Sequence, residues 1–554
     1  MNSDTRNIHF NGFGACAPAK WVLALCLLAP LCATAQSACE SLVGRKIPAG
    51  VIGLPTGGAV VQSATVVAAG SSNNVNGEYC LVRGVILPAT AAPNIQFEVN
   101  LPVNWNRKVL QMGGGGFDGS LVTGLKGEGL QPSADATPLK RGYVTAGSDG
   151  GHEGGPGFDG SFGLNDEALL NYGQQSVKKV HDVVVDIVRA HYGRLPRRFY
   201  FIGNSQGGHE ALDAAARYPK DYDGVVANYP AYNVTMLHLA SLNVGNALYN
   251  NGGAGWLNAA KTKLLTGAVR TACDPLDGAT DGIVSNVEAC HAAFTVATVR
   301  ATLRCAGGAD TGDDCLSDAQ IDAVDKISSP YRPGFAIAGA EVFPRWALLE
   351  GSRFEVSNFG SRRVPANPPT TDDALLYNAG AATTKYIITR NPTFDALTFN
   401  PGEWKARVEE AGTIMDVTDI DLTPFRKRGG KIIMTHGTED DFISPHNSEA
   451  YYERHLALQG RKAMDGFVRF YEIPGFSHGF GSFNARYDGL GVLDDWVDKG
   501  RAPGTLIAID ENPSAVKRAR PMCLFPSWPK YTSVTGGPQN EAASFSCVSP
   551  EKAK

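Results

Sequence analysis

The chain has 554 residues, a formal net charge of -5 and no long basic run. This length exceeds what one ordinary hydrophobic core accommodates, so we expect a core domain with a large insertion. The charge balance argues against nucleic acid as a partner, because the sequence has nothing that resembles a basic stripe for phosphates.

Residues 1–35 read as a secretory signal peptide, with a positively charged start, an apolar stretch at 21–31 and a small-residue cleavage site at 33–35. The apolar stretch is too short to span a membrane. Lipidation at Cys39 is a weaker alternative, because residues 36–38 lack the leucine usual before a lipidated cysteine. We therefore expect a secreted or periplasmic protein with no membrane attachment in its mature form.

Eight cysteines follow the signal, an even number that suggests four disulfides in an oxidising compartment. No Cys-x-x-Cys motif favours a zinc or redox site. Sequence neighbours give the simplest pairing: Cys39–Cys80, Cys273–Cys290, Cys305–Cys315 and Cys523–Cys547.

Strand and helix signals alternate through the first part of the mature chain. This alternation predicts a mainly parallel sheet with helices between its strands. The expected strands lie at 59–61, 79–82, 97–102, 108–112, 143–146 and 199–202, and an amphipathic helix is expected over 174–192.

Four glycines, residues 113–116, follow the strand at 108–112. A phosphate cradle is disfavoured, because no Gly-Lys-Ser/Thr follows and no Gly-x-Gly-x-x-Gly opens a helix. The other interpretations are an oxyanion loop that turns a backbone N–H toward a substrate carbonyl, and a flexible turn.

Gly203-Asn204-Ser205-Gln206-Gly207 stands between the strand at 199–202 and an Ala-rich helical stretch at 210–218. Strand, Gly-x-Ser-x-Gly turn and helix are the parts of a nucleophile elbow, whose glycines let backbone and helix crowd together. The pattern predicts Ser205 as the nucleophile of an α/β-hydrolase fold.

Strand signals become sparse over 230–422, where four of the eight mature cysteines lie. We interpret this segment as a lid domain inserted into a core made of residues 36–229 and 423–554. Core strands resume at 430–436 and 467–473, and a helix is expected near 490–499.

A serine nucleophile needs a base to take its proton and an acid to orient that base. Asp440 and His478 lie just after the strands at 430–436 and 467–473, in the chain order usual for this fold. Asp149 and His152 are disfavoured because they precede the serine. The alternatives are Glu439 and Asp441 for the acid, and His436 and His446 for the base. His209, in the first turn of the helix after the serine, is expected to pack or hydrogen-bond locally.

The lid contains an acidic loop at 273–283, with three aspartates, two turn-forming glycines and carbonyls at alternate positions. This composition suits a hard cation with six to eight oxygen ligands, although the spacing differs from an EF-hand. An acidic surface turn is the alternative.

Taken together, these motifs resemble the tannase and feruloyl esterase family over nearly the whole mature chain. The likeness rests on the glycine loop and the serine elbow, which runs on to Tyr218-Pro219 and to residues 223–227. It also rests on the His436-Gly437-x-x-Asp440 segment with Pro445, on Pro474-Gly475-x-x-His478, on Trp496-Val497 and on Arg520-Pro521-Met522-Cys523-Leu524-Phe525-Pro526.

The resemblance implies a secreted α/β-hydrolase with a large lid between nucleophile and acid, and it favours Asp440 as the acid. It implies oxyanion donors at Gln206 and at Gly115 or Gly116. The four disulfides also match the family's usual set. For the lid it implies a structural calcium ion held by the side chains of Asp274, Asp277 and Asp281 and the carbonyls of Ala279 and Ile283.

One departure from the family concerns a cysteine pair that usually bridges the residue before the serine and the residue after the histidine. Those positions hold Asn204 and Gly479 here. Because both cysteines are absent together, we interpret the chain as a member of a subgroup without this bridge.

The expected activity is hydrolysis of a small aromatic carboxylic ester (feruloyl, galloyl or terephthalate/phthalate monoester) through an acyl-enzyme. Arg390 is a candidate for a substrate carboxylate, with a surface salt bridge as the alternative; Phe394 and Phe399 either line the acyl pocket or fill the lid core. The competing hypotheses are a secreted serine peptidase and a non-catalytic binding protein on the same fold. The sequence does not indicate the oligomeric state.

Overall fold

The computed structural model describes residues 37–155, 158–418, 420–513, 517–532 and 537–550. The expected signal peptide at 1–35 lies outside the described residues. Within the described part of the chain, no helix combines the length and the apolar character needed to cross a membrane.

A mixed sheet of thirteen strands forms the core, in the order β1-β2-β3-β4-β6-β5-β7-β8-β9-β10-β13-β12-β11. The six strands from β6 to β10 in this order pair in parallel, as the strand and helix signals predict, whereas both edges of the sheet are antiparallel. The strands are β1 (Lys46–Ile47), β2 (Gly58–Val67), β3 (Tyr79–Leu87), β4 (Ile95–Pro102), β5 (Lys108–Met112), β6 (Val144–Ser148), β7 (Arg198–Asn204), β8 (Gly224–Asn228), β9 (Lys431–Gly437), β10 (Val468–Ile473), β11 (Ala485–Arg486), β12 (Leu506–Asp510) and β13 (Ala519–Leu524), with β14 (Trp528–Tyr531) and β15 (Phe545–Val548) as a separate hairpin.

Helices cover both faces of the parallel strands. The helices of the core are α2 (Asp166–Leu170), α3 (Ser176–Tyr192), α4 (Gln206–Arg217), α13 (Thr423–Arg428), α14 (Pro445–Gln459), α15 (Arg461–Asp465) and α16 (Gly489–Lys499). Phe199 and Phe201 of β7 pack in the cluster that contains α3 and α4, and Tyr200 and Ile202 pack in the cluster that contains α16. Successive side chains of a strand point to opposite faces, so a strand buried on both faces reads as a continuous apolar run.

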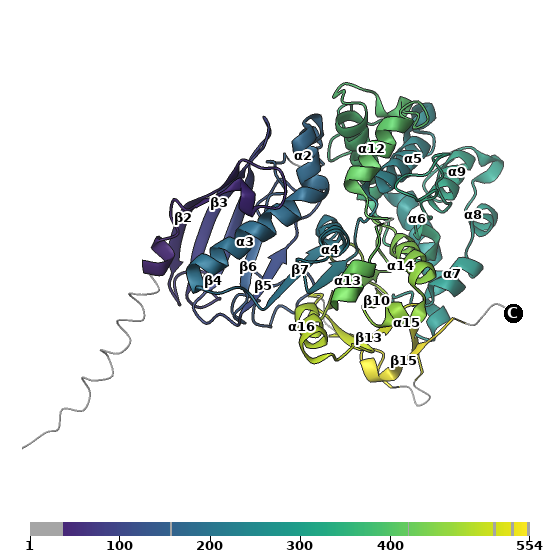
Figure 1. Cartoon of the computed structure of the whole chain (residues 1–554). Helices are drawn as coiled ribbons and strands as arrows, with labels where there is room; N and C mark the ends of the chain where they lie inside the picture. Colours follow the sequence, from purple (N-terminus) through teal and green to yellow (C-terminus); the bar gives the residue numbers. More distant parts are fainter. Residues whose placement is uncertain (1–36, 156–157, 419, 514–516, 533–536, 551–554) are drawn as a thin grey trace, which may run out of the picture.

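Most of the chain between β8 and β9 forms a group of helices beside the sheet, drawn in teal and green in Figure 1. This is the segment that the sequence analysis interpreted as a lid, and we keep that name for it. An apolar cluster that the lid shares with neighbouring core segments includes much of α5, which packs closely on α11. The α-helices of the lid are α5 (Val234–Gly253), α6 (Ala259–Cys273), α7 (Val287–Ala293), α8 (Val296–Thr302), α9 (Asp318–Ile327), α10 (Val356–Phe359), α11 (Leu375–Ala382) and α12 (Lys405–Met415).

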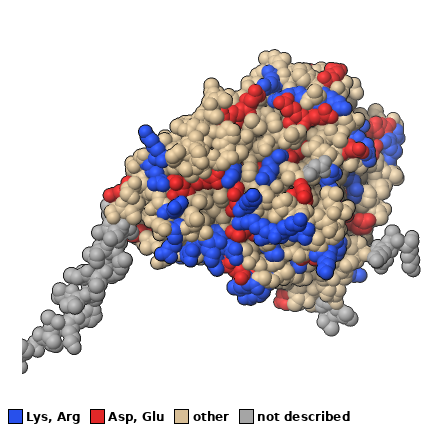
Figure 2. Space-filling view, in the orientation of Figure 1, with Lys and Arg blue, Asp and Glu red and all other residues tan. Residues whose placement is uncertain are grey.

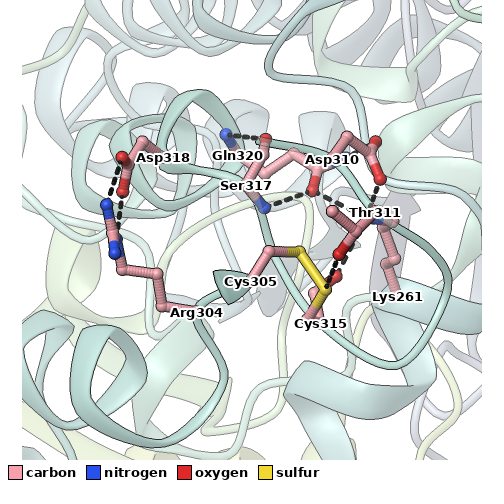
Figure 3. Close-up of a disulfide and its surroundings, with 9 residues drawn as sticks. All are labelled: Lys261, Arg304, Cys305, Asp310, Thr311, Cys315, Ser317, Asp318 and Gln320. Carbon is pink, nitrogen blue, oxygen red and sulfur yellow. Dashed lines mark hydrogen bonds and ion pairs between the residues drawn. A yellow bond between two sulfur atoms is a disulfide. The ribbon is translucent and has the colours of Figure 1, made fainter. Parts of the chain in front are cut away.

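The four predicted disulfides, Cys39–Cys80, Cys273–Cys290, Cys305–Cys315 and Cys523–Cys547, are present. Figure 3 shows the one between Cys305 and Cys315, which closes a short loop in the lid. The ammonium group of Lys261, only 3% exposed, donates to Asp310 at 2.8 Å and to the carbonyl of Cys315 at 2.9 Å. A buried cation and a covalent bridge therefore hold this lid loop together.

Basic and acidic side chains are interspersed on the face of the molecule shown in Figure 2. Asp498 on α16 forms ion pairs with three basic residues: Lys108 at 2.8 Å, Arg197 at 2.6 Å and Arg198 at 2.9 Å. These pairs tie the amino ends of β5 and β7 to the helix that covers one face of the sheet.

Candidate active site

Ser205 lies in a sharp turn between β7 and α4, with φ 57° and ψ -116°. A positive φ is strained for a serine, and such strain is typical of nucleophile elbows. Two glycines permit the turn: a Cβ on Gly203 would lie 2.3 Å from the backbone of Gly207, and one on Gly207 would lie 2.8 Å from the carbonyl oxygen of Gly114. The elbow predicted from the sequence is therefore built by close backbone contact.

The structure brings Ser205, His478 and Asp440 into one hydrogen-bonded chain. The Nε2 atom of His478 lies 2.9 Å from the Oγ of Ser205, and its Nδ1 atom lies 2.9 Å from Oδ2 of Asp440. The three residues come from separate parts of the sheet: the elbow after β7, the loop at 438–444 after β9 (the acid loop), and the loop at 474–482 after β10 (the histidine loop). This geometry lets His478 accept the serine proton while Asp440 orients the ring.

Asp440 is fully buried, and backbone amides fix its other oxygen: Oδ1 accepts from the N–H groups of Phe442 and Ile443, both at 2.9 Å. Burial alone would raise the pKa of Asp440, but His478 and His436 outweigh it and hold that pKa well below its ordinary value. For His478, burial is the largest single influence and lowers the pKa, but the charge and the hydrogen bond of Asp440, together with the charge of Asp441, outweigh burial, so the net pKa is above the ordinary value. The acid is thus ionised and the base is positioned to become an imidazolium.

The two alternative acids do not contact His478 through a hydrogen bond. Asp441 accepts the hydroxyl proton of Ser477 at 2.8 Å, and Glu439 accepts the backbone N–H of Ser482 at 3.0 Å. Both partners belong to the histidine loop, on either side of His478. The sequence analysis did not predict this arrangement, and three consecutive acidic residues were the signal that pointed to the loop.

The other three histidines do not hydrogen-bond to Ser205, although His436 lies 3.3 Å from Oδ2 of Asp440. His436 lies against the Oγ of Ser448 at 2.7 Å and the carbonyl oxygen of Ile443 at 3.0 Å. His446 is enclosed by carboxylates of the lid and of α14. Neither ring nitrogen of His209 finds a hydrogen-bond partner among the described residues, and burial lowers its pKa to about 3. Of the candidate histidines, His478 is therefore the one placed against Ser205.

Asp149 and His152, which the sequence analysis disfavoured because they precede the serine, have structural contacts of their own. Asp149 accepts backbone N–H groups from Gln96 and Gly151, and His152 lies 2.8 Å from the carbonyl oxygen of Phe117. They shape the end of the glycine-rich loop.

The glycine-rich loop reaches the elbow from β5. The amide of Gly113 donates to the carbonyl of Ile202 at 3.0 Å, and that of Gly114 donates to the carboxylate of Glu210 at 3.0 Å. No hydrogen bond within the described residues uses the amides of Gly115 and Gly116. Gln206 begins α4, a position whose N–H has no acceptor inside the helix. These amides match the donors that the resemblance implies.

At the position of the absent cysteine, Asn204 belongs to a row of hydrogen bonds across three strand ends. Its Oδ1 accepts from Nδ2 of Asn228 at 2.9 Å, and Oδ1 of Asn228 accepts from Oγ1 of Thr435 at 2.7 Å. Gly479, the other position, has φ 92°, which favours glycine. The row joins the nucleophile strand to the strand that precedes the acid loop.

The three candidate substrate-binding residues make the structural contacts that the sequence analysis named as alternatives to substrate binding. Arg390 pairs with the carboxylate of Asp166, whose side chain is 77% exposed. Phe394 packs edge-to-face on Phe399 and on Trp404, with ring centroids 6.3 Å apart in both cases. In this conformation Arg390 forms a surface salt bridge and the two phenylalanines pack against the lid core.

In the 273–283 loop, each aspartate accepts hydrogen bonds from backbone amides of the loop or of the residues just after it. Asp281 also pairs with Arg520 of β13. Across the described residues, no three His, Cys, Asp or Glu side chains gather into a group that could hold a metal ion. A cation in this loop would therefore depend on the carbonyls of Ala279 and Ile283 as well as on carboxylates.

Comparisons with known proteins show the family and the fold of the chain. The family described as tannase and feruloyl esterase matches residues 80–548. An uncharacterized esterase of Agrobacterium fabrum is 38% identical over 93% of each chain. Mono(2-hydroxyethyl) terephthalate hydrolase of Piscinibacter sakaiensis is 32% identical over 85% of each chain.

Among solved structures, feruloyl esterase B from Aspergillus oryzae superposes with a TM-score of 0.74 at 24% identity, covering 93% of this chain and all of its own. At this identity the likeness establishes the fold. The chain has the α/β-hydrolase fold, with a mixed sheet that is parallel at its centre and helices on both faces.

Proposed function

Because the chain belongs to the tannase and feruloyl esterase family and is a carboxylic ester hydrolase, we propose that it cleaves aromatic carboxylic esters with Ser205 as nucleophile. The observation that carries this proposal is the chain of two 2.9 Å contacts from Ser205 through His478 to Asp440.

In the proposed reaction the Oγ of Ser205 attacks the ester carbonyl carbon and its proton moves to Nε2 of His478. Amides of Gln206 and of Gly115 or Gly116 hold the resulting oxyanion, and loss of one such donor typically costs about 2.7–4 kcal/mol of transition-state stabilisation. The alcohol leaves with the proton from His478. Water, deprotonated by the same ring, then attacks the acyl-enzyme, and release of the acid restores Ser205.

An aromatic substrate is supported by aromatic side chains beside His478. The cavity of about 370 Å³ between core and lid, lined in part by Phe158, Leu375 and Tyr386, has no triad residue in its lining. The ring of Phe158 stacks on Phe442 with centroids 5.4 Å apart, and Phe442 lies edge-on to His478 at 5.3 Å. Aromatic side chains therefore run in contact from the lining of this cavity to His478. The names of the relatives that act on terephthalate and feruloyl esters support the same class.

Arg390 becomes a candidate for a substrate carboxylate if its pair with Asp166 opens, since the partner is exposed. Arg390→Ala should then raise KM for a terephthalate monoester and leave KM for a methyl ester unchanged. Equal effects on both esters would assign Arg390 a structural role.

Export is the second part of the proposal. Four disulfides in the described chain favour an oxidising compartment outside the cytoplasm. Fractionation of cells that express the full chain should recover it in the periplasm or the medium.

The experiment that tests the activity is a panel of ferulate, gallate, terephthalate and phthalate monoesters, with a peptide substrate alongside. Wild type should hydrolyse at least one aromatic ester and leave the peptide intact, and Ser205→Ala should lose about 10⁴-fold or more in kcat with an unchanged melting temperature. Ester turnover that persists in Ser205→Ala would exclude Ser205 as nucleophile, and peptide cleavage would favour a peptidase.

A further inference from the structure

Asp441 follows the proposed catalytic acid directly and holds the loop that carries the proposed base. Its Oδ1 accepts the hydroxyl proton of Ser477 at 2.8 Å, and Ser477 is the residue before His478. Asp441 is 7% exposed and Ser477 is fully buried, so water does not compete for this bond.

The lid supports Asp441 from the other side. The side-chain amide of Asn358, at the end of lid helix α10, donates to the backbone carbonyl of Asp441 at 3.4 Å. Asn358 is 1% exposed, and its own Oδ1 accepts the amide of Glu355 at 2.7 Å, which fixes its orientation. Asp441 is therefore held between the lid and the histidine loop.

Charged and titratable groups around His478 come from the two loops and from the end of β8. The acid loop contributes Asp440 and Asp441, and Tyr229 lies edge-on to the imidazole at 4.8 Å. Burial raises the pKa of Tyr229, so this phenol is neutral. Asp440 and, less strongly, Asp441 raise the pKa of His478, and burial raises the pKa of Asp441 itself to about 6.

We propose that Asp441 is a positioning residue for His478: it fixes the histidine loop through Ser477 and sets a second negative charge beside the imidazole. The inference rests on the proposed function, because it assumes that His478 is the base. The two neighbouring carboxylates then have different tasks. Asp440 orients the imidazole ring, and Asp441 holds the histidine loop and favours the protonated form of the ring.

Two variants separate the two tasks. Asp441→Asn keeps an oxygen that can accept from Ser477 and removes the ionisable group. Ser477→Ala removes the hydrogen bond and keeps the carboxyl group. Without the charge, the imidazolium loses stabilisation, so the acidic limb of kcat/KM against pH should move to lower pH by about half a unit or more. Ser477→Ala keeps the carboxyl group near the ring, so its limb should move less than that of Asp441→Asn, and its kcat should fall about threefold or more because the ring is held less firmly.

Glu439→Gln is the matched control, because it removes a buried carboxyl group from the same loop and keeps an acceptor for Ser482. Its acidic limb should coincide with that of wild type. Melting temperatures of all variants establish that they are folded. An acidic limb of Asp441→Asn that coincides with wild type, or a wild-type kcat in Ser477→Ala, would overturn the proposal. Ester hydrolysis by Ser205→Ala would instead refute the proposed function itself. The results therefore distinguish a failure of that proposal from a failure of the role assigned to Asp441.

Discussion

The side-chain amide of Asn228 donates a 2.9 Å hydrogen bond to Oδ1 of Asn204, the residue directly before Ser205. Asn228 is fully buried and bonds in turn to Thr435. We propose that this row of side chains supports the elbow in a subgroup of the family without the usual cysteine bridge.

Replacement of Asn204 by alanine should destabilise the protein. It leaves a buried amide of Asn228 without its acceptor, which typically costs about 1–3 kcal/mol. We expect a lower melting temperature and a lower kcat, because the elbow loses a support next to Ser205. Asn94→Ala, at an exposed position, is the control and should change stability by less than about 0.5 kcal/mol. A melting temperature equal to wild type in Asn204→Ala would contradict this role.

The dependence of kcat/KM on pH should show a single acidic limb from His478. The reaction needs the neutral imidazole, and Asp440 raises the pKa of His478 above its ordinary value of about 6.5. Activity should therefore fall as pH decreases through a midpoint above about 6.5. Steady-state kinetics between pH 4 and 9 on one aromatic ester measure this midpoint, and a value well below 6 would be inconsistent with the described contact.

A buried ion cluster joins the lid to the core at His446. The Nε2 atom of His446 lies 2.5 Å from Glu350 of the lid, and its Nδ1 atom lies 3.0 Å from Glu449 of α14. Glu350 also contacts Arg345 at 2.5 Å and His291 at 2.8 Å. Burial alone lowers the pKa of His446, but the two carboxylates raise it to about 10.

A group whose pKa is raised on folding stabilises the protein fully below its unfolded pKa, about 6.5 for histidine. That stabilisation is lost as pH rises through the folded value, here about 10. We expect the melting temperature to fall between about pH 6.5 and 10, with a smaller fall in His446→Gln. Differential scanning calorimetry of both proteins checks this, and identical slopes would show that His446 does not contribute.

We also propose that the 273–283 loop binds a structural calcium ion. Asp277 is 1% exposed, and no ion pair within the described chain includes it, so the loop buries a carboxylate without a basic partner at contact distance. The side chains of Asp274, Asp277 and Asp281 and the carbonyls of Ala279 and Ile283 would be the ligands.

If calcium is bound, EDTA should lower the melting temperature and added Ca²⁺ should restore it, because a ligand of the folded state stabilises that state. Asp277→Asn should melt lower and respond less to EDTA. Metal analysis of the purified protein should give about one calcium per chain. Absence of calcium together with no effect of EDTA would refute the site.

Local sequence patterns determined much of the fold. The elbow was identified from an apolar strand, from Gly203 and Gly207 around Ser205, and from the helix that follows. Few residues other than glycine allow the close contact between strand and helix that this turn requires. The parallel centre of the sheet followed from alternating strands and helices. The antiparallel edge strands β12 and β13 were not predicted, since their pairing depends on segments that return to the sheet from a distance.

The sequence by itself placed Ser205, one of three acids and one of several histidines in the right chain order. The spacing left Glu439 and Asp441 open beside Asp440, and the family resemblance favoured Asp440. The tertiary structure shows the contact itself, between Asp440 and His478. Neighbouring residues of a loop have the same sequence context, and their directions are fixed by contacts with another loop more than thirty residues away. The partners of Asn204 likewise could not be predicted from the sequence, because Asn228 and Thr435 belong to two other strands that only the fold brings beside it.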